Sequence, residues 1–333
     1  MSLLFLEESG TTVRIDSNRV IVSYKDGLSR SLPIESVDGI TIFGNINLTT
    51  PCIQTFLRSG IPVSFCSKGG KYFGRLHSTG HMNAPRQRQQ CKLYESDFAI
   101  QLGKRIISAK LKNQRVILRR YSRNGDSDIS ESMKLITSCI SKIPAADTIE
   151  EIMGYEGQGA KVYFRALAEL IEPEFRFKGR SKRPPMDEFN SMISLGYSLL
   201  MNELYAAIEM KGLNPYFGFI HRDKERHPTL ASDLMEEWRA TIVDSVAMSL
   251  VNGHEIQKDH FIFDFEDPGC YLTKDGMRIF LNKLERRMQN KMNYLSYTDF
   301  AISFRQAINM QVDSLVRAIE QEDAELYKPV EIR

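Results

Sequence analysis

The chain has 333 residues, of which 42% are hydrophobic and 26% are charged, as is typical of a globular protein of about two domains. With a net charge of +2, any binding of nucleic acid has to depend on local clusters of basic residues. The five cysteines form no Cys-x-x-Cys pair, which argues against a disulfide framework and a zinc site and favours a reducing cytoplasm. An apolar run at residues 3–6 is too short for a signal peptide or a membrane span.

Residues 11–76 alternate between apolar and polar side chains and are interrupted by turn residues, a pattern that predicts short strands. The predicted strands are Thr12 to Ile15, Arg19 to Tyr24, Arg30 to Ile34, Gly39 to Phe43, Pro62 to Phe65 and Lys71 to Leu76. A cap threonine, Pro51 in the first turn and Gly60 as a stop predict one helix among them, Thr50 to Ser59. No catalytic cluster appears here, so the region is interpreted as a scaffold or dimerisation domain.

The chain changes character after residue 77. Gly80, Asn83 and Pro85 break every periodicity, and the residues that follow are helical in composition. The sequence therefore predicts an α+β protein with a small β-rich domain (1–77), a linker (78–88) and a larger all-α domain (89–333). Helices are predicted at about 89–123, 129–141, 187–211, 229–252, 274–288 and 299–327.

The first of these helices is strongly basic. Between residues 99 and 125 there are eight basic residues and no acidic one. At about 100° per residue, five of them fall within an arc of about 100° on one helix face: Lys104, Lys112, Arg115, Arg119 and Arg123. A solvated face usually mixes charges of both signs, so this basic stripe favours phosphate binding, with a solvated face as the alternative.

Three later features also carry polar groups that suit a site. Glu156 lies between glycines, where a ligand can approach the backbone closely, although a helix-dipole role is the alternative. Asn190 and Tyr197 share a face of the helix at 187–211 and are candidates to line a site. Residues 175–185 carry five basic residues and predict a mobile basic loop with two candidate DNA contacts, Arg180 and Arg183.

Residues 214–239 gather histidine, carboxylates and arginines in one short stretch. Asp233 and Glu236 are three residues apart on one helix face, and a loop that folds back over the first turn would bring His221 beside them. One imidazole and two carboxylates suit a divalent ion with open water positions, while a dipole role for the carboxylates remains the alternative. Three nearby arginines are candidate phosphate contacts, unless they pair with neighbouring acids: Arg222, Arg226 and Arg239.

Three blocks together resemble one family. The first reads Gly154-Tyr-Glu-Gly-x-Gly-Ala-Lys-x-Tyr-Phe, and the second reads Arg183-Pro-Pro-x-Asp-x-x-Asn-x-x-x-Ser-x-Gly-Tyr. The third runs from Asn214-Pro-x-x-Gly-x-x-His to Asp233-Leu-Met-Glu-Glu-x-Arg. In this combination and order they are similar to the CRISPR adaptation integrases, the Cas1 family, and the similarity covers essentially the whole chain.

This resemblance implies an asymmetric two-domain protein that forms a homodimer, joins the small partner Cas2 and inserts foreign DNA fragments into a CRISPR array. The family's metal-binding glutamate, histidine and final acid fall on Glu156, His221 and Glu236, and a further catalytic acid falls on Asp233. Many relatives carry aspartate where this chain has Glu236, so Glu236 and Asp233 both stay candidates for the closest metal bond.

The implied chemistry is metal-dependent phosphodiester hydrolysis and transesterification on double-stranded DNA. A divalent ion withdraws charge from the phosphate and lowers the pKa of the attacking hydroxyl, and Mg²⁺ or Mn²⁺ fits carboxylate and imidazole ligands. Two other classes stay open: a catalytically inactive DNA-binding subunit of the same assembly, and a metal-dependent hydrolase of small phosphoesters. The basic stripe argues against the second.

Overall fold

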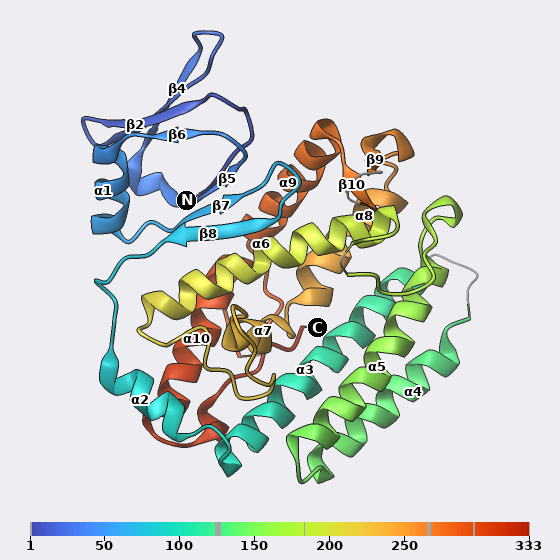
Figure 1. Cartoon of the computed structure of the whole chain (residues 1–333). Helices are drawn as coiled ribbons and strands as arrows, with labels where there is room; N and C mark the ends of the chain where they lie inside the picture. Colours follow the sequence, from blue (N-terminus) through green and yellow to red (C-terminus); the bar gives the residue numbers. More distant parts are fainter. Residues whose placement is uncertain (1, 124–127, 183, 265–267, 296, 333) are drawn as a thin grey trace. The chain divides into compact units, whose positions relative to one another are not determined.

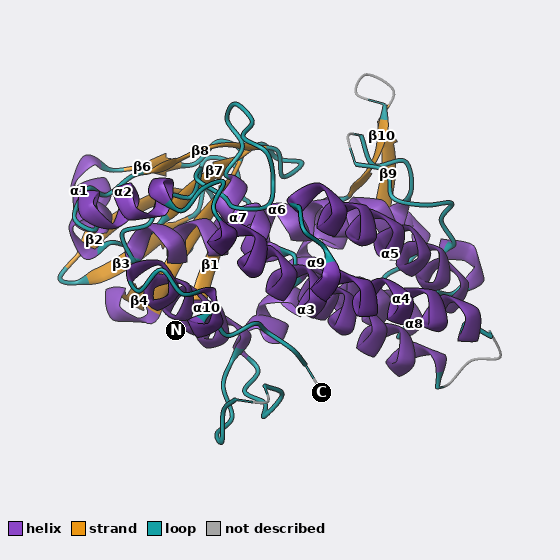
Figure 2. Cartoon of the chain, turned by 90° about the horizontal axis from the view of Figure 1, so that it is seen from below, coloured by secondary structure: helices purple, strands orange, loops and turns teal. Residues whose placement is uncertain are grey.

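The computed structural model describes residues 2–123, 128–182, 184–264, 268–295 and 297–332. The chain divides into two compact units, Met1–Met82 and Asn83–Arg333. Strands dominate the first unit and helices dominate the second (Figures 1 and 2). The predicted α+β class, with β-rich residues ahead of a larger helical part, is confirmed.

In the described part of the first unit, eight strands form two sheets beside one α-helix, α1 (Thr50–Ser59). One sheet has the order β1-β5-β7-β8, with β1 (Ser2–Leu6), β5 (Val37–Phe43), β7 (Val63–Cys66) and β8 (Tyr72–Leu76). The other has the order β4-β3-β2-β6, with β4 (Ser29–Pro33), β3 (Arg19–Ser23), β2 (Thr12–Asp16) and β6 (Asn47–Leu48). Their apolar faces and that of α1 meet in one core, which includes Val13, Val20, Ile42 and Phe56.

The helix lies where the sequence predicts it, and each of the six predicted strands overlaps an observed one. Strands β1 and β6 are not predicted. The apolar run at residues 3–6 belongs to β1, which pairs in parallel with β5. Since β5 has neighbours on both sides, it is a central strand and its side chains are buried almost continuously.

The second unit consists mainly of helices that pack against one another (Figures 1 and 2). The α-helices described are α2 (Ala84–Lys92), α3 (Asp97–Ser122), α4 (Ser130–Lys142), α5 (Ile149–Leu170), α6 (Glu188–Met210), α7 (Thr229–Met235), α8 (Ser245–Asn252), α9 (Lys274–Gln289) and α10 (Phe304–Glu320). Helix α5 packs against both α3 and α4. Helix α3 is central, because its buried residues recur along most of its length. No helix in the described part of the chain is long and apolar enough to cross a membrane.

Three expectations for this unit need correction. The helix predicted at 89–123 is two helices, because Glu95 adopts a left-handed φ of 60° between α2 and α3. Helix α2 begins at Ala84, so the second half of the predicted linker is helical. The part predicted as all-α also contains a small antiparallel hairpin of β9 (Phe261–Asp264) and β10 (Gly269–Leu272).

The helix predicted from 229 to 252 is interrupted. Helix α7 ends at Met235, a π-helical turn covers Arg239–Asp244, and α8 follows. In a π turn each hydrogen bond spans one residue more than in an α-helix, and such turns often occur at functional sites. The residues just before and within it, Glu236 and Arg239, are those that the sequence analysis singles out.

Candidate active site

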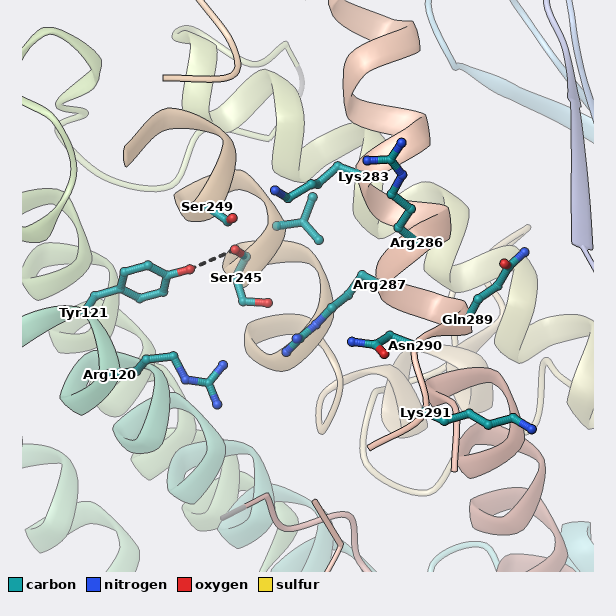
Figure 3. A pocket seen from close by; sticks show the side chains of 11 residues that line it. Arg120, Tyr121, Ser245, Ser249, Lys283, Arg286, Arg287, Gln289, Asn290 and Lys291 are labelled. Carbon is teal, nitrogen blue, oxygen red and sulfur yellow. Dashed lines mark hydrogen bonds between the residues drawn. The ribbon is translucent and has the colours of Figure 1, made fainter. Parts of the chain in front are cut away.

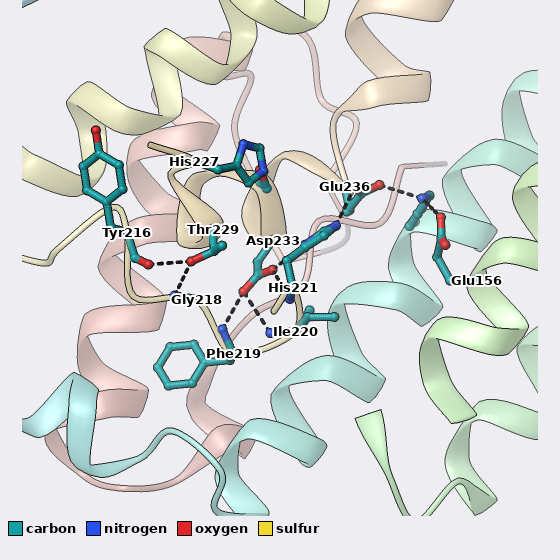
Figure 4. Close-up of polar contacts among 12 residues, drawn as sticks. Glu156, Tyr216, Gly218, Phe219, Ile220, His221, His227, Thr229, Asp233 and Glu236 are labelled. Atoms are coloured by element: carbon teal, nitrogen blue, oxygen red, sulfur yellow. Dashed lines mark hydrogen bonds and ion pairs between the residues drawn. The ribbon is translucent and has the colours of Figure 1, made fainter. Parts of the chain in front are cut away.

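The loop before α7 folds back onto that helix and brings His221 to Asp233 (Figure 4). Asp233 is buried, and its Oδ2 accepts the backbone N–H groups of Phe219 at 2.7 Å and Ile220 at 3.1 Å. Its Oδ1 accepts the backbone N–H of His221 at 3.0 Å and lies 2.7 Å from Nδ1 of the ring. When Nδ1 donates to this carboxylate, Nε2 is the ring atom that carries the lone pair in the neutral imidazole.

Close packing at Gly218 makes this arrangement possible. A Cβ atom at this position would lie 2.8 Å from Asp233 Oδ2 and 2.8 Å from the carbonyl carbon of Thr229. Thr229 fixes the same stretch by accepting the Gly218 N–H at 2.9 Å and donating to the Tyr216 carbonyl at 2.5 Å. The loop is therefore held to the first turn of α7 by contacts that any side chain at Gly218 would disturb.

Glu236 and Glu156 meet at a third charged group, the ammonium of Lys110. Glu236 Oε1 lies 3.8 Å from His221 Nε2 and 3.1 Å from Arg239 Nε, and its Oε2 lies 2.6 Å from Lys110 Nζ. Lys110 Nζ also forms an ion pair with Glu156 Oε1. Residues from α3, α5, the turn after α7 and the preceding loop thus converge on one small volume.

The charged groups in this cluster favour one another's ionised forms. Burial acts to raise the pKa of Glu236, but the cations of Arg239 and Lys110 outweigh it and lower the pKa to about 2. Burial acts to lower the pKa of Lys110, but the carboxylates of Glu236 and Glu156 raise it above its ordinary value. For His221, burial acts to lower the pKa, but the hydrogen bond and charge of Asp233 outweigh it and raise the pKa above its ordinary value.

Arg239 is positioned by a buried tyrosine. Its guanidinium carbon lies 4.6 Å from the ring centre of Tyr197, an attractive cation–π distance. The Tyr197 hydroxyl donates to Asp244 Oδ1 at 2.5 Å, and the Tyr163 hydroxyl donates to Asp244 Oδ2 at 2.8 Å. Tyr197 therefore contacts Arg239, which in turn pairs with Glu236. Asn190 instead forms hydrogen bonds with residues 179–181 and holds that segment to α6.

Two carboxylates and an imidazole are side chains of the types that bind a divalent ion. The Lys110 ammonium is a cation already held by two carboxylate oxygens, and the imidazole Nε2 lies beside one of those carboxylates. Within the described residues, no three His, Cys, Asp or Glu side chains are arranged as ligands of a single ion. Glu156, Glu236 and His221 would hold a metal here. Asp233 is an orienting group, because its oxygens already accept hydrogen bonds from the loop.

The predicted DNA-binding stripe on α3 is partly engaged within the chain. Lys104 donates to the Pro144 carbonyl at 3.1 Å, Lys112 pairs with Glu331 at 2.7 Å, and Arg115 donates to Thr137 Oγ1 at 3.1 Å. The remaining two side chains of the stripe, Arg119 and Arg123, are exposed. DNA contact by these residues stays a prediction.

The candidate contacts outside α3 differ in their surroundings. Arg180 bonds to Asn190 Oδ1 at 2.8 Å and Ser194 Oγ at 3.2 Å, so this part of the predicted mobile loop is held to α6. Arg222 is exposed and pairs with Glu150 at 2.9 Å. Arg183 lies outside the described residues.

A basic pocket that the sequence analysis does not single out lies between α3, α8 and α9 (Figure 3). Its volume is about 660 Å³, and its lining includes five cationic side chains and no acidic one: Arg120, Lys283, Arg286, Arg287 and Lys291. Lys283 pairs with Glu255, but the other four form no ion pair with a carboxylate in the described part of the chain. Four of the five cations lie close together at 283–291, and this local cluster was the sequence signal that could have revealed the pocket.

Comparison with known proteins identifies the family that this chain resembles. The family profile of CRISPR associated protein Cas1 matches residues 4–286. The CRISPR-associated endonuclease Cas1 of Mycobacterium tuberculosis is 36% identical over 321 residues, which cover 96% of this chain and 94% of that protein.

Two solved structures share the fold. A chain of a Cas6-RT-Cas1–Cas2 complex aligns with a TM-score of 0.83 and 23% identity, over 98% of this chain and 36% of that chain. A casposase bound to integration product aligns with a TM-score of 0.85 and 23% identity, over 99% of this chain and 94% of that chain. The fold neighbours therefore include a Cas1–Cas2 complex and an integration complex.

Proposed function

The chain belongs to the Cas1 family of CRISPR-associated proteins, and we propose that it is a divalent-metal-dependent DNA endonuclease and integrase that inserts foreign DNA fragments into a CRISPR array. The observation that carries the proposal is the contact of Glu156 and Glu236, from separate parts of the chain, with one cation, the Lys110 ammonium, while His221 Nε2 lies 3.8 Å from the Glu236 carboxylate. Its partners would be double-stranded DNA, Cas2 and a second copy of the chain. We place its activity in the cytoplasm, where a CRISPR array and invading DNA meet.

The reaction would be a transesterification. The oxygen of a DNA 3′-hydroxyl attacks a phosphorus of the target strand, a new phosphodiester forms, and the 3′-oxygen of the target leaves. One phosphodiester replaces another, so no external energy source is needed; water in place of the hydroxyl would give cleavage. Mg²⁺ or Mn²⁺, when bound, would withdraw charge from the phosphate and lower the pKa of the attacking hydroxyl.

The chain's own residues prepare the site for this reaction. Asp233 fixes the His221 ring so that Nε2 lies on the side of Glu236. Arg239 keeps Glu236 ionised and is itself held against Tyr197. Exposed cations would hold the phosphates of the bound strands. The best placed are those of the basic pocket and the two exposed residues of the α3 stripe, Arg119 and Arg123.

The test separates catalysis from binding. His221→Ala should abolish strand joining and metal-dependent cleavage in Mn²⁺, because it removes an imidazole ligand, and should leave DNA affinity nearly unchanged. His254→Ala is the matched control, since His254 is an exposed histidine of the same unit. Integration is measured on a supercoiled plasmid that carries an array, and affinity by fluorescence anisotropy. Full strand joining by His221→Ala would overturn the mechanism. An inactive wild-type protein that still binds DNA would favour the DNA-binding subunit instead.

A further inference from the structure

Lys110 is the cation at the centre of the candidate site. In the sequence it is simply one of the eight basic residues between positions 99 and 125. Its side chain is 6% exposed and is flanked on α3 by the fully buried Ala109 and Leu111. Nζ reaches Glu236 Oε2 at 2.6 Å and pairs with Glu156 Oε1. A lysine is rarely buried to this extent unless it is paired, and here it has two partners.

The two carboxylates need this cation when no metal is bound. Two ionised carboxylates at such close range repel each other, and burial strengthens the repulsion. Arg239 pairs with Glu236 at 3.1 Å but forms no ion pair with Glu156 in the described structure. Within the described residues, Lys110 is the side chain whose cation contacts both acids.

We propose that Lys110 is an internal counter-ion that keeps Glu156 and Glu236 together before a divalent metal binds, and that it leaves their oxygens when the metal enters. This role rests on the metal site of the proposed function. It makes the Lys110 ammonium a competitor of the metal for the two carboxylates. The ammonium and the metal require the same two carboxylates, so each metal that binds has to displace two ion pairs. Lys110 would therefore stabilise the metal-free protein and weaken its metal affinity.

Two measurements on the full chain test this role. Thermal unfolding is followed in EDTA and in Mn²⁺, and Mn²⁺ affinity is measured by titration calorimetry at pH 8. The variants are Lys110→Met, Lys110→Arg and Lys112→Met. The last is the matched control, because Lys112 lies on the same helix but pairs with Glu331 away from the two acids.

Lys110→Met should lower the melting temperature in EDTA, show a larger rise on addition of Mn²⁺ than the wild type, and bind Mn²⁺ roughly tenfold more tightly. Lys110→Arg keeps the charge and should remain close to the wild type in both measurements. Lys112→Met should leave Mn²⁺ affinity unchanged. If Lys110→Met folds only in the presence of Mn²⁺, that result also supports the role, since the ion then replaces the missing cation.

These measurements distinguish a failure of the counter-ion role from a failure of the proposed function. A wild type that binds no Mn²⁺ would contradict the metal site and with it the proposed function. A wild type that binds Mn²⁺ together with a Lys110→Met variant of equal or weaker affinity would overturn the counter-ion role alone. If Lys110→Met fails to fold in either condition, Lys110→Met with Glu156→Gln removes one acid as well. That double variant should fold in EDTA, and its failure to do so would show that Lys110 serves general packing.

Discussion

Asp233 illustrates how one carboxylate can shape a site through its hydrogen bonds. Both of its oxygens accept hydrogen bonds from the backbone of residues 219–221, and one of them also holds the His221 ring. A carboxylate used in this way has little capacity left for a metal. It fixes the tautomer and the direction of the imidazole, which are properties that a ligand needs before the ion arrives.

A second buried carboxylate, Asp244, should make stability depend on pH. Burial raises the pKa of Asp244 to about 6, against the hydrogen bonds from Tyr197 and Tyr163. The folded state then binds a proton more tightly than the unfolded chain, so stability is lost as pH rises through 6. Between pH 5 and pH 8 the loss should be about 1 kcal/mol.

Urea unfolding of the wild type and Asp244→Asn at the two pH values measures this effect. Asparagine keeps one acceptor for a tyrosine and cannot ionise, so the variant should lack this part of the pH dependence. Relative to the variant, the wild type should therefore lose unfolding free energy between pH 5 and pH 8. A constant difference would mean that Asp244 keeps one protonation state over the whole range.

The residues of the site differ in how visible they are in the sequence. His221, Asp233 and Glu236 occur within one loop and one helix turn, so their spacing indicates that they can meet if the loop folds back over the helix. Glu156 is distant along the chain, and only the resemblance to a family links it to His221. Lys110 appears as one cation among eight, because nothing in its neighbourhood on α3 indicates that two acids from other elements will surround it.

At the scale of elements, the important distinction is between cations that are paired within the chain and cations that are not. Helix α3 presents Lys112 and Arg115 to partners of its own unit, Glu331 and Thr137. Helix α9 and the end of α3 present their cations to an open pocket (Figure 3). The pocket is therefore the better candidate for a phosphate backbone.

DNA affinity at several salt concentrations should show this difference. Changing the exposed pocket residues Arg120, Arg286 and Lys291 to Ala should flatten the plot of log affinity against log salt by up to about 0.9 per lost phosphate contact on duplex. The triple change of Lys112, Arg115 and Arg119 to Ala should flatten it less, because two of these side chains already have partners. Equal slopes for the two triple variants would assign the same role to both surfaces.

Element boundaries were harder to predict than element types. The periodicity of residues 89–123 is helical throughout, and it hides the break at 93–96 because Glu95 adopts a left-handed conformation without being glycine. Strand β1 was missed because an apolar run of four residues shows no alternation. Its identity as a strand depends on pairing with β5, which is a tertiary contact.

At the scale of the whole molecule, the two units have separate tasks. The candidate site lies entirely within the helical unit, and the β-rich unit contributes no residue to it. The β-rich unit instead exposes aromatic side chains on β8, which is the last strand of its sheet: Tyr72 is 41% and Phe73 is 68% exposed. Apolar groups at a sheet edge are typical of a surface that pairs with another chain.

We expect a homodimer that uses this edge. Light scattering at micromolar concentration and physiological salt should give twice the mass of one chain. Phe73→Asp should shift the mass toward that of a single chain, because it places a charge in the contact. Phe300→Asp, at a side chain 63% exposed in the helical unit, is the control and should leave the mass doubled. A wild type with the mass of one chain would contradict the dimer.

The π turn at Arg239–Asp244 makes the active site sensitive to the number of residues as well as to their identity. Removing one residue there would allow ordinary helical hydrogen bonds to form, and the helix beyond the turn would keep its register, because the π turn already holds one residue more than an α-helix. Glu236, the proposed metal ligand, precedes the turn and Asp244 ends it, so the change would fall on the turn itself, which begins at Arg239. A single-codon deletion in this segment should therefore alter the placement of Arg239 between Glu236 and Tyr197 and leave α8 in place.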